Sequence, residues 1–156
     1  MYHLVHANIA IMRAPWDDPR MAGFVARIDD IDALAQPCPG FVSQPTPPDE
    51  GSVYTGRSML NLSIWKSVES LEQFTYGGEH ALMLERRAEW FHQQDRPNYV
   101  LFWLPEGQIP TEREVQNRID HLAAVGATPY AFTFDQRFTI QEMLEYAEIA
   151  ARADSA

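Results

Sequence analysis

The chain has 156 residues, of which 46% are hydrophobic and 12% aromatic, and its formal net charge at pH 7 is -10. This length and composition are typical of one globular domain with a substantial core, and they exclude a disordered chain. The negative charge argues against a nucleic-acid partner and against an anionic membrane surface, because both are bound by clustered Lys and Arg.

The only cysteine, Cys38, excludes an internal disulfide and a cysteine zinc cluster. The N-terminal segment has neither the basic start of a signal peptide nor a long apolar run. We therefore expect a cytoplasmic protein that makes no contact with membranes.

The first third of the chain predicts a strand, a helix and a second strand. Alternation over residues 3–12 predicts the first strand, with His6 and Asn8 on the same face. An Asp-Pro pair at 18–19 predicts the start of a helix, because it supplies an N-cap carboxylate and a proline at the first helical position. Apolar residues recur at helical spacing up to residue 34, and residues 41–44 predict the second strand.

The middle of the chain begins with a turn-rich connection over residues 45–57, which is either the lid or rim of a pocket or a mobile loop. Residues 60–65 alternate again and predict a third strand. One face of this strand carries Asn61, Ser63 and Trp65.

A helix broken by two glycines follows the third strand. Apolar spacing predicts a first piece over residues 68–74, ended by the glycines at 77–78, and a second piece over residues 80–92. Offsets of four, seven and eleven place four side chains of the second piece on one face, namely His80, Leu84, Arg87 and Phe91. Residues 99–104 form an unbroken apolar run, which predicts a strand covered on both sides.

The order strand, helix, strand, strand, helix, strand is that of the ferredoxin-like split βαβ pattern, an α+β fold with an antiparallel sheet. Beyond it, Thr111 with Glu114 and Thr139 with Glu142 form two capping boxes. They predict a helix that ends at Gly126 and a last helix over residues 140–151, with an edge strand over residues 131–134 between them.

Short stretches spread over residues 4–134 match one known family. They are Asn8-Ile9-Ala10, Ala14-Pro15, Asp17-Asp18-Pro19-Arg20, Pro39-Gly40-Phe41-Val42, Asn61-Leu62-Ser63-Ile64-Trp65, His80, Arg86-Arg87, Trp90-Phe91, Phe102-Trp103 and Ala131-Phe132-Thr133-Phe134. In these stretches the chain resembles a bacterial family of unknown function in the dimeric α+β barrel superfamily. The resemblance implies a barrel domain over residues 1–134 and a C-terminal helical tail over residues 135–156.

The superfamily further implies a homodimer in which two four-stranded sheets meet. Its members include antibiotic-biosynthesis monooxygenases and haem-degrading monooxygenases. In the haem-degrading type, an asparagine on the first strand, a tryptophan on the third and a histidine on the second helix surround the haem. By this resemblance Asn8, Trp65 and His80 are the candidate catalytic residues.

The residues themselves also single out His80 and Arg87. A neutral imidazole at position 80 can act as a general base or ligate haem iron, while the structural alternative is a hydrogen bond to a backbone carbonyl. An arginine on an apolar stripe predicts an anionic partner, such as a substrate carboxylate or a haem propionate. Its alternative is an intramolecular ion pair or a side chain that extends to solvent.

Polar residues on strands extend the candidate binding site. Asparagine is unfavourable in the middle of a strand, so Asn8 beside His6, and Asn61 beside Ser63, predict donors that face a common cavity. Phe91 and Trp103 are candidate walls of that cavity. The alternative for the polar strand residues is a polar dimer interface, and the alternative for Phe91 and Trp103 is ordinary core packing.

Three functions follow from these observations. The first is a cofactor-independent oxidoreductase of the monooxygenase type that acts on an aromatic or polyketide-like molecule. The second is a haem b enzyme of the dehydratase or oxidase type with His80 as the axial metal ligand, and the third is a non-catalytic binding or dimerisation module. We expect a homodimer, because helices on one side of a four-stranded sheet would leave its other face bare.

Overall fold

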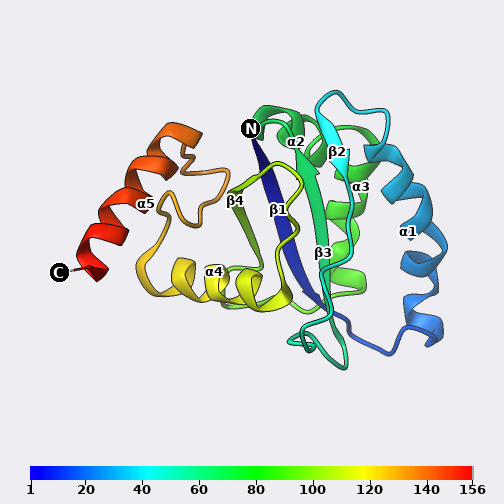
Figure 1. Cartoon of the computed structure of the whole chain (residues 1–156). Helices are drawn as coiled ribbons and strands as arrows, with labels where there is room; N and C mark the ends of the chain where they lie inside the picture. Colours follow the sequence, from blue (N-terminus) through cyan, green and yellow to red (C-terminus); the bar gives the residue numbers. More distant parts are fainter. Residues whose placement is uncertain (156) are drawn as a thin grey trace.

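The computed structural model describes residues 1–155, which form one antiparallel sheet and five α-helices. The strands are β1 (Tyr2–Ile11), β2 (Phe41–Ser43), β3 (Ser58–Trp65) and β4 (Tyr99–Pro105), in the order β2-β3-β1-β4. The helices are α1 (Ala22–Ala35), α2 (Val68–Thr75), α3 (Gly78–Arg86), α4 (Glu112–Val125) and α5 (Ile140–Asp154). This order of strands and helices confirms the ferredoxin-like α+β fold (Figure 1).

One face of the sheet packs against α4. Alternate residues of β1, including Val5 and Ala7, point to this face, where they form a buried cluster with Val115 and Ile119 of α4. The capping box at Thr111 and Glu114 starts this helix as the sequence predicts. The cluster is the main hydrophobic core, and α4 lies across it in Figure 1.

This arrangement corrects one premise of the sequence interpretation. The sheet face opposite α1–α3 is covered by the chain's own α4, so it is not bare, and Val5 on that face is only 1% exposed. The homodimer stays a prediction, but a bare sheet face does not support it.

The other face of the sheet is covered by α1, α2 and α3, and two separate clusters hold these helices. Met21, just before α1, packs with Trp90 at one end of the face. Ala35, at the far end of α1, packs with Trp65 and Leu4 at the opposite end. Helix α1 is therefore anchored at both ends, while its middle spans the space between the clusters.

Two local predictions are wrong. The helix predicted over residues 80–92 ends at Arg86 and continues only as a 3-10 turn, because Phe91 leaves the helix to form a bridge with Met12 beside β1. The predicted edge strand at 131–134 is reduced to two isolated bridges, Phe132 with Leu101 and Ala131 with Thr128. For residues 45–57 the sequence leaves open a lid or rim of a pocket and a mobile loop. In the structure Glu112 of α4 accepts hydrogen bonds from the backbone of Val53 and Tyr54, which ties this connection to the other face of the sheet.

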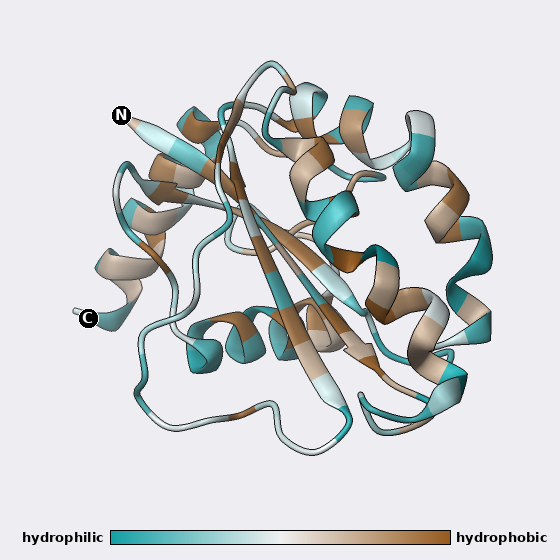
Figure 2. Cartoon of the chain, turned by 90° about the vertical axis from the view of Figure 1, so that its right-hand side faces the viewer, coloured by the Kyte–Doolittle hydropathy of each residue, from teal (hydrophilic) through white to brown (hydrophobic). Residues whose placement is uncertain are grey.

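Helix α5 starts at a capping box, as predicted, and has no buried residue. It lies at the edge of the molecule in Figure 1, and Figure 2 shows apolar and polar residues alternating along its length. Among residues 1–155, no helix is both long and apolar enough to cross a membrane.

Candidate functional site

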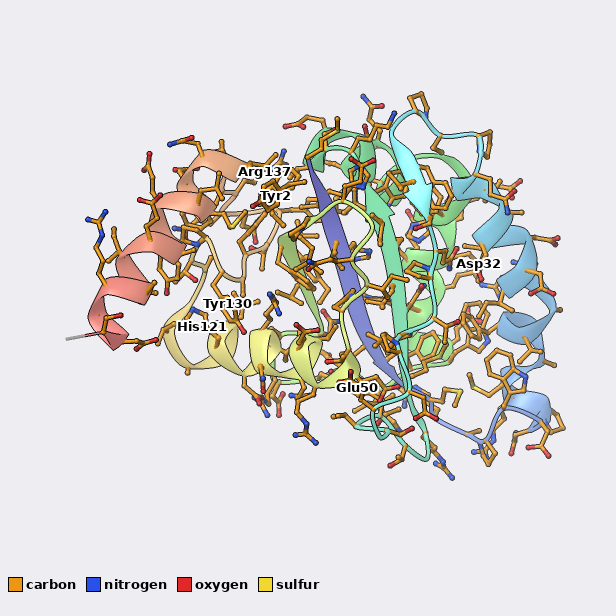
Figure 3. The ribbon with its side chains drawn as sticks, viewed as in Figure 1. Tyr2, Asp32, Glu50, His121, Tyr130 and Arg137 are labelled. Atoms are coloured by element: carbon orange, nitrogen blue, oxygen red, sulfur yellow. The ribbon has the colours of Figure 1, made fainter. Side chains whose placement is uncertain are left out.

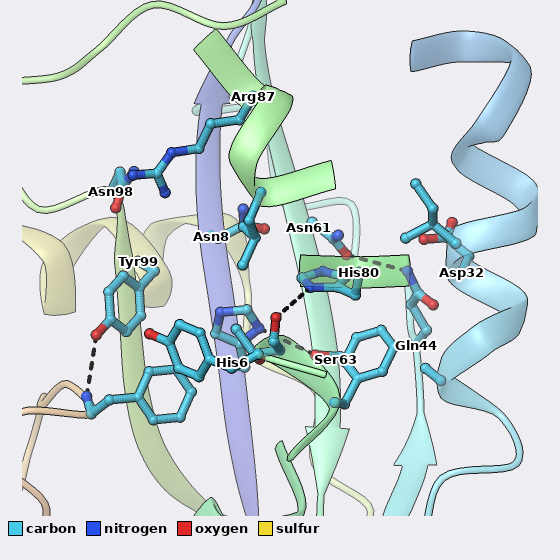
Figure 4. A pocket seen from close by; sticks show the side chains of 17 residues that line it. His6, Asn8, Asp32, Gln44, Asn61, Ser63, His80, Arg87, Asn98 and Tyr99 are labelled. Carbon is cyan, nitrogen blue, oxygen red and sulfur yellow. Dashed lines mark hydrogen bonds between the residues drawn. The ribbon is translucent and has the colours of Figure 1, made fainter. Parts of the chain in front are cut away.

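Two adjoining cavities of about 170 and 570 Å³ lie between the middle of α1, helix α3 and the sheet. The smaller, inner cavity reaches from His6 to Arg87, and the larger, outer one extends from there towards Trp90. The sheet, helix α1 and the segment of α3 all contribute residues that line both cavities. These residues include Asn8, Asn61, Asp32, His80, Leu84 and Arg87. Figure 4 shows the side chains of the inner cavity.

Strand pairing supplies the polar floor of the inner cavity. In the antiparallel register of β1 and β3, His6 lies opposite Ser63 and Asn8 opposite Asn61, so all four side chains share one face. The Asn61 side-chain oxygen accepts a hydrogen bond of 3.3 Å from Gln44. The Asn8 side-chain oxygen is buried and has no hydrogen-bond partner in the described chain. Buried polar atoms are almost always paired, so Asn8 is suited to accept a hydrogen bond from a bound molecule.

The two glycines between α2 and α3 bring His80 to the cavity. Gly78 has a φ of 54°, in the left-handed region, and a Cβ at Gly77 would collide with the Gln73 carbonyl oxygen. The resulting sharp turn folds the start of α3 back over the end of α2. His80 Nδ1 then lies 2.9 Å from the Thr75 carbonyl oxygen.

This contact fixes the chemistry of the His80 ring. A carbonyl oxygen only accepts, so Nδ1 carries the proton and donates it, which leaves the lone pair of the neutral ring on Nε2. Burial lowers the pKa of His80, against the opposing effects of the Thr75 hydrogen bond and the Asp32 carboxylate. His80 is therefore a neutral base at pH 7 with a defined orientation.

His6 belongs to a second hydrogen-bonded group. The Trp65 indole N–H donates to the Ser63 hydroxyl oxygen at 2.9 Å, and that hydroxyl lies 3.4 Å from His6 Nδ1. Burial lowers the pKa of His6 to about 4, and the proximity of His80 adds to this effect. His6 is consequently neutral throughout the physiological range.

Charges gather at the mouth of the site. Arg87 lines both cavities, and its guanidinium extends towards Asn98 in Figure 4. Asp32 of α1 also lines both cavities, and Figure 3 shows its place on the inner side of that helix. The site thus has one carboxylate near the histidines and an arginine near the start of β4.

Most of the site residues predicted from sequence come together. The inner cavity is lined by His6, Asn8, Asn61, Ser63, His80 and Arg87, and Phe91 lines the outer one. Trp65 and Trp103 line neither. Trp65 is fully buried, stacked on Phe74, and reaches the site only through Ser63, while the Trp103 indole N–H donates to the Phe138 carbonyl beside the C-terminal segment.

The inner cavity is also lined by four polar residues that the sequence patterns did not indicate, namely Asp32, Gln44, Asn98 and Tyr99. A signal exists for Asp32, because it lies four residues after Ile28 and three before Ala35 and so interrupts the apolar stripe of α1. No such signal exists for Tyr99, which belongs to an apolar run and is placed by the register that sets it opposite Asn8.

If a haem were bound, His80 would be the lining residue placed to serve as its axial ligand. His80 Nε2 is free to act as an axial ligand because Nδ1 is anchored, as is usual for metal-binding histidines. Within residues 1–155 there is no group of three His, Cys, Asp or Glu side chains that could hold a metal ion.

The fold and this cavity define a ferredoxin-like α+β domain with a polar pocket between its helices and its sheet. A family model described as a domain of unknown function (DUF3291) matches residues 3–148. The chain therefore belongs to the DUF3291 family, which confirms the family proposed from sequence.

Solved structures with a similar chain path include two bacterial proteins. One is SnoaB from Streptomyces nogalater, described as a cofactor-independent oxygenase, with 12% identity, a TM-score of 0.45, and coverage of 72% of this chain and 100% of SnoaB. The other is Rv0793 from Mycobacterium tuberculosis, with 12% identity, a TM-score of 0.47, and coverage of 71% and 100%. No curated protein sequence matches this chain.

Proposed function

We propose that this protein is a small-molecule enzyme in which His80 removes a proton from a bound organic substrate, the first step of a cofactor-independent oxygenation. One observation carries this proposal: His80 is a neutral imidazole, anchored through Nδ1, in a cavity large enough for an organic molecule. The Asn8 side-chain oxygen, buried and unpaired, is available to orient a hydroxyl or amide of the substrate.

The two histidines have different suitability as bases. A general base is most effective when its pKa is near the working pH, and the His6 pKa of about 4 makes that side chain a poor proton acceptor at pH 7. His80 keeps two features that raise its pKa, the Thr75 carbonyl and the Asp32 carboxylate. We therefore assign proton removal to His80 and substrate positioning to His6, Asn8 and Asn61.

The oxidative step needs molecular oxygen as co-reactant. Loss of a proton from an activated CH2 group of an aromatic ketone leaves an enolate, which is oxidised by O2. The CH2 carbon becomes a C=O carbon, and the second oxygen atom leaves as water with the two hydrogens. One O2 is reduced for each CH2 oxidised, and no other reductant is required.

Anthrone, a three-ring ketone with one activated CH2, tests this proposal in an oxygen electrode. We expect the protein to consume one O2 per anthraquinone formed, and His80→Gln to lower the rate by at least about 100-fold. His121→Gln is the matched control, because His121 lies at the end of α4, which packs on the other face of the sheet (Figure 3). Equal rates for wild type and His80→Gln would reject the assignment.

Haem binding is the second candidate, and the orientation of His80 favours it. His80 Nε2 would be the axial ligand and Arg87 could contact a propionate, and the iron when bound would supply redox chemistry. Oxygen consumption that requires added hemin, with a Soret band lost in His80→Ala, would favour this function. No turnover with intact ligand binding would instead favour a non-catalytic binding module.

A further inference from the structure

We propose that the molecule bound in this site is an organic anion with a flat apolar body, whose acidic group contacts Arg87 at the junction of the two cavities. This inference rests on the proposed function, since it requires the cavities to bind a small molecule. It adds the class of that molecule, an aromatic carboxylate or a comparable monoanion.

The charge of the cavity lining supports an anion. The whole chain carries 22 acidic residues against 12 Lys and Arg. The two cavities reverse this ratio, because their lining includes Arg13, Arg87 and Arg96 but only one carboxylate, Asp32. A positive pocket in an acidic protein raises the local concentration of anionic ligands.

Of the three arginines, Arg87 is the one whose side chain forms neither a hydrogen bond nor a salt bridge within residues 1–155. Arg96 is paired with Asp120 at 2.6 Å, and the Arg13 Nε–H donates to the Ala88 carbonyl oxygen at 2.8 Å. Arg87 forms no salt bridge within residues 1–155, and it alone of the three lines both cavities. Its planar guanidinium matches a carboxylate in shape and in hydrogen-bond donors.

The two histidines of the site are not expected to bind the acidic group of the ligand. Burial lowers the pKa of both His6 and His80, so neither carries the positive charge that attracts an acid at pH 7. A ligand whose acidic group lies at Arg87 therefore stays next to His80 and Asn8, which line both cavities.

The outer cavity suits an aromatic body. Its lining combines aromatic rings with flexible methionines, which adapt to flat ligands. These residues are Phe24, Ile28, Met59, Met83, Trp90 and Phe91. A volume of about 570 Å³ is within the range of pockets that enclose drug-sized molecules.

A pair of fluorescent dyes that differ only in charge tests the inference. 1-Anilinonaphthalene-8-sulfonate carries one negative charge, and N-phenyl-1-naphthylamine is the same molecule without the sulfonate. At pH 7 we expect wild type to bind the anionic dye about tenfold more tightly than the neutral one, as a charge-assisted hydrogen bond predicts. Arg87→Met should remove this preference and retain binding of the neutral dye, which also reports that the cavity is folded.

Two further variants complete the experiment. Arg113→Met removes an exposed arginine of α4, outside both cavities, and should keep the tenfold preference although the net charge changes equally. Arg87→Lys keeps the charge and should retain most of the preference. Equal binding of both dyes by wild type, or a preference that survives in Arg87→Met, overturns the anion inference alone. Failure of wild type to bind either dye overturns the proposed function as well.

Discussion

At the scale of single residues, the two histidines of the site are held in uncharged forms. The Thr75 carbonyl fixes the proton of His80, and the hydroxyl of Ser63 connects His6 to the buried indole of Trp65. Trp65 lines neither cavity, so under the proposed function it would be a positioning residue. Its effect on the site passes through Ser63.

The pKa of His6 predicts how stability depends on pH. The folded protein takes up a proton at His6 only near pH 4, whereas the unfolded chain does so near pH 6.5. The folded protein therefore has its full stability with respect to His6 above pH 6.5. It loses stability as the pH falls from 6.5 to 4, because the unfolded state then binds more protons than the folded state. Between pH 7 and pH 5 the free energy of unfolding should fall by about 2 kcal/mol from this group.

Urea unfolding at the two pH values measures this difference. His6→Gln should reduce the fall by about 2 kcal/mol. The lowered pKa of His80 acts in the same direction, so part of the fall should persist in His6→Gln. An unchanged pH dependence in His6→Gln would show that His6 is not held neutral.

At the scale of elements, the helices divide between stability and function. Helix α4 covers the main core, whereas the middle of α1 and the start of α3 line the cavities. This division explains why α1, with its regular apolar spacing, has only Ala35 buried. Ile28 and Ile31, in the middle of α1, line a hollow instead of filling a core.

The role of α4 can be tested with one substitution at two positions. Val115 is fully buried and Val125, in the same helix, is 66% exposed. Val115→Ala should lower the free energy of unfolding by about 2 kcal/mol, because it removes two methyl groups from the core, and Val125→Ala by less than about 0.5 kcal/mol. Chemical denaturation measures both values, and equal losses would contradict the packing of α4 on the sheet.

Sequence patterns predicted the elements better than the contacts between them. Period-two alternation placed His6 and Asn8 on one face of β1, and pairing with β3 brought them to Asn61 and Ser63. Alternation predicts which face of the sheet a side chain is on, but it does not predict which element covers that face. The packing of α4 on the core and the contact of Trp103 with the C-terminal segment could therefore not be predicted from it. The end of α3 was missed because the bridge between Met12 and Phe91 is a long-range contact that overrides local helical spacing.

At the scale of the whole molecule, the clusters at the two ends of α1 keep a hollow open above the sheet. Met21 with Trp90 holds one end, and Ala35 with Trp65 holds the other. The cavity is thus part of the fold and needs no lid from residues 45–57. A homodimer, still a prediction, would have to use a surface other than the sheet face that α4 covers.

Under the proposed function, the hollow binds a small organic molecule beside two neutral histidines. Side-chain ¹⁵N NMR of the histidines, recorded from about pH 7 to pH 4 with and without N-phenyl-1-naphthylamine, tests it most directly. We predict that His6 titrates near pH 4, that His80 carries its proton on Nδ1 at pH 7, and that the dye shifts both signals but not those of His121. A His6 that titrates near pH 6.5, with His6 and His80 signals that do not respond to the dye, would contradict the account.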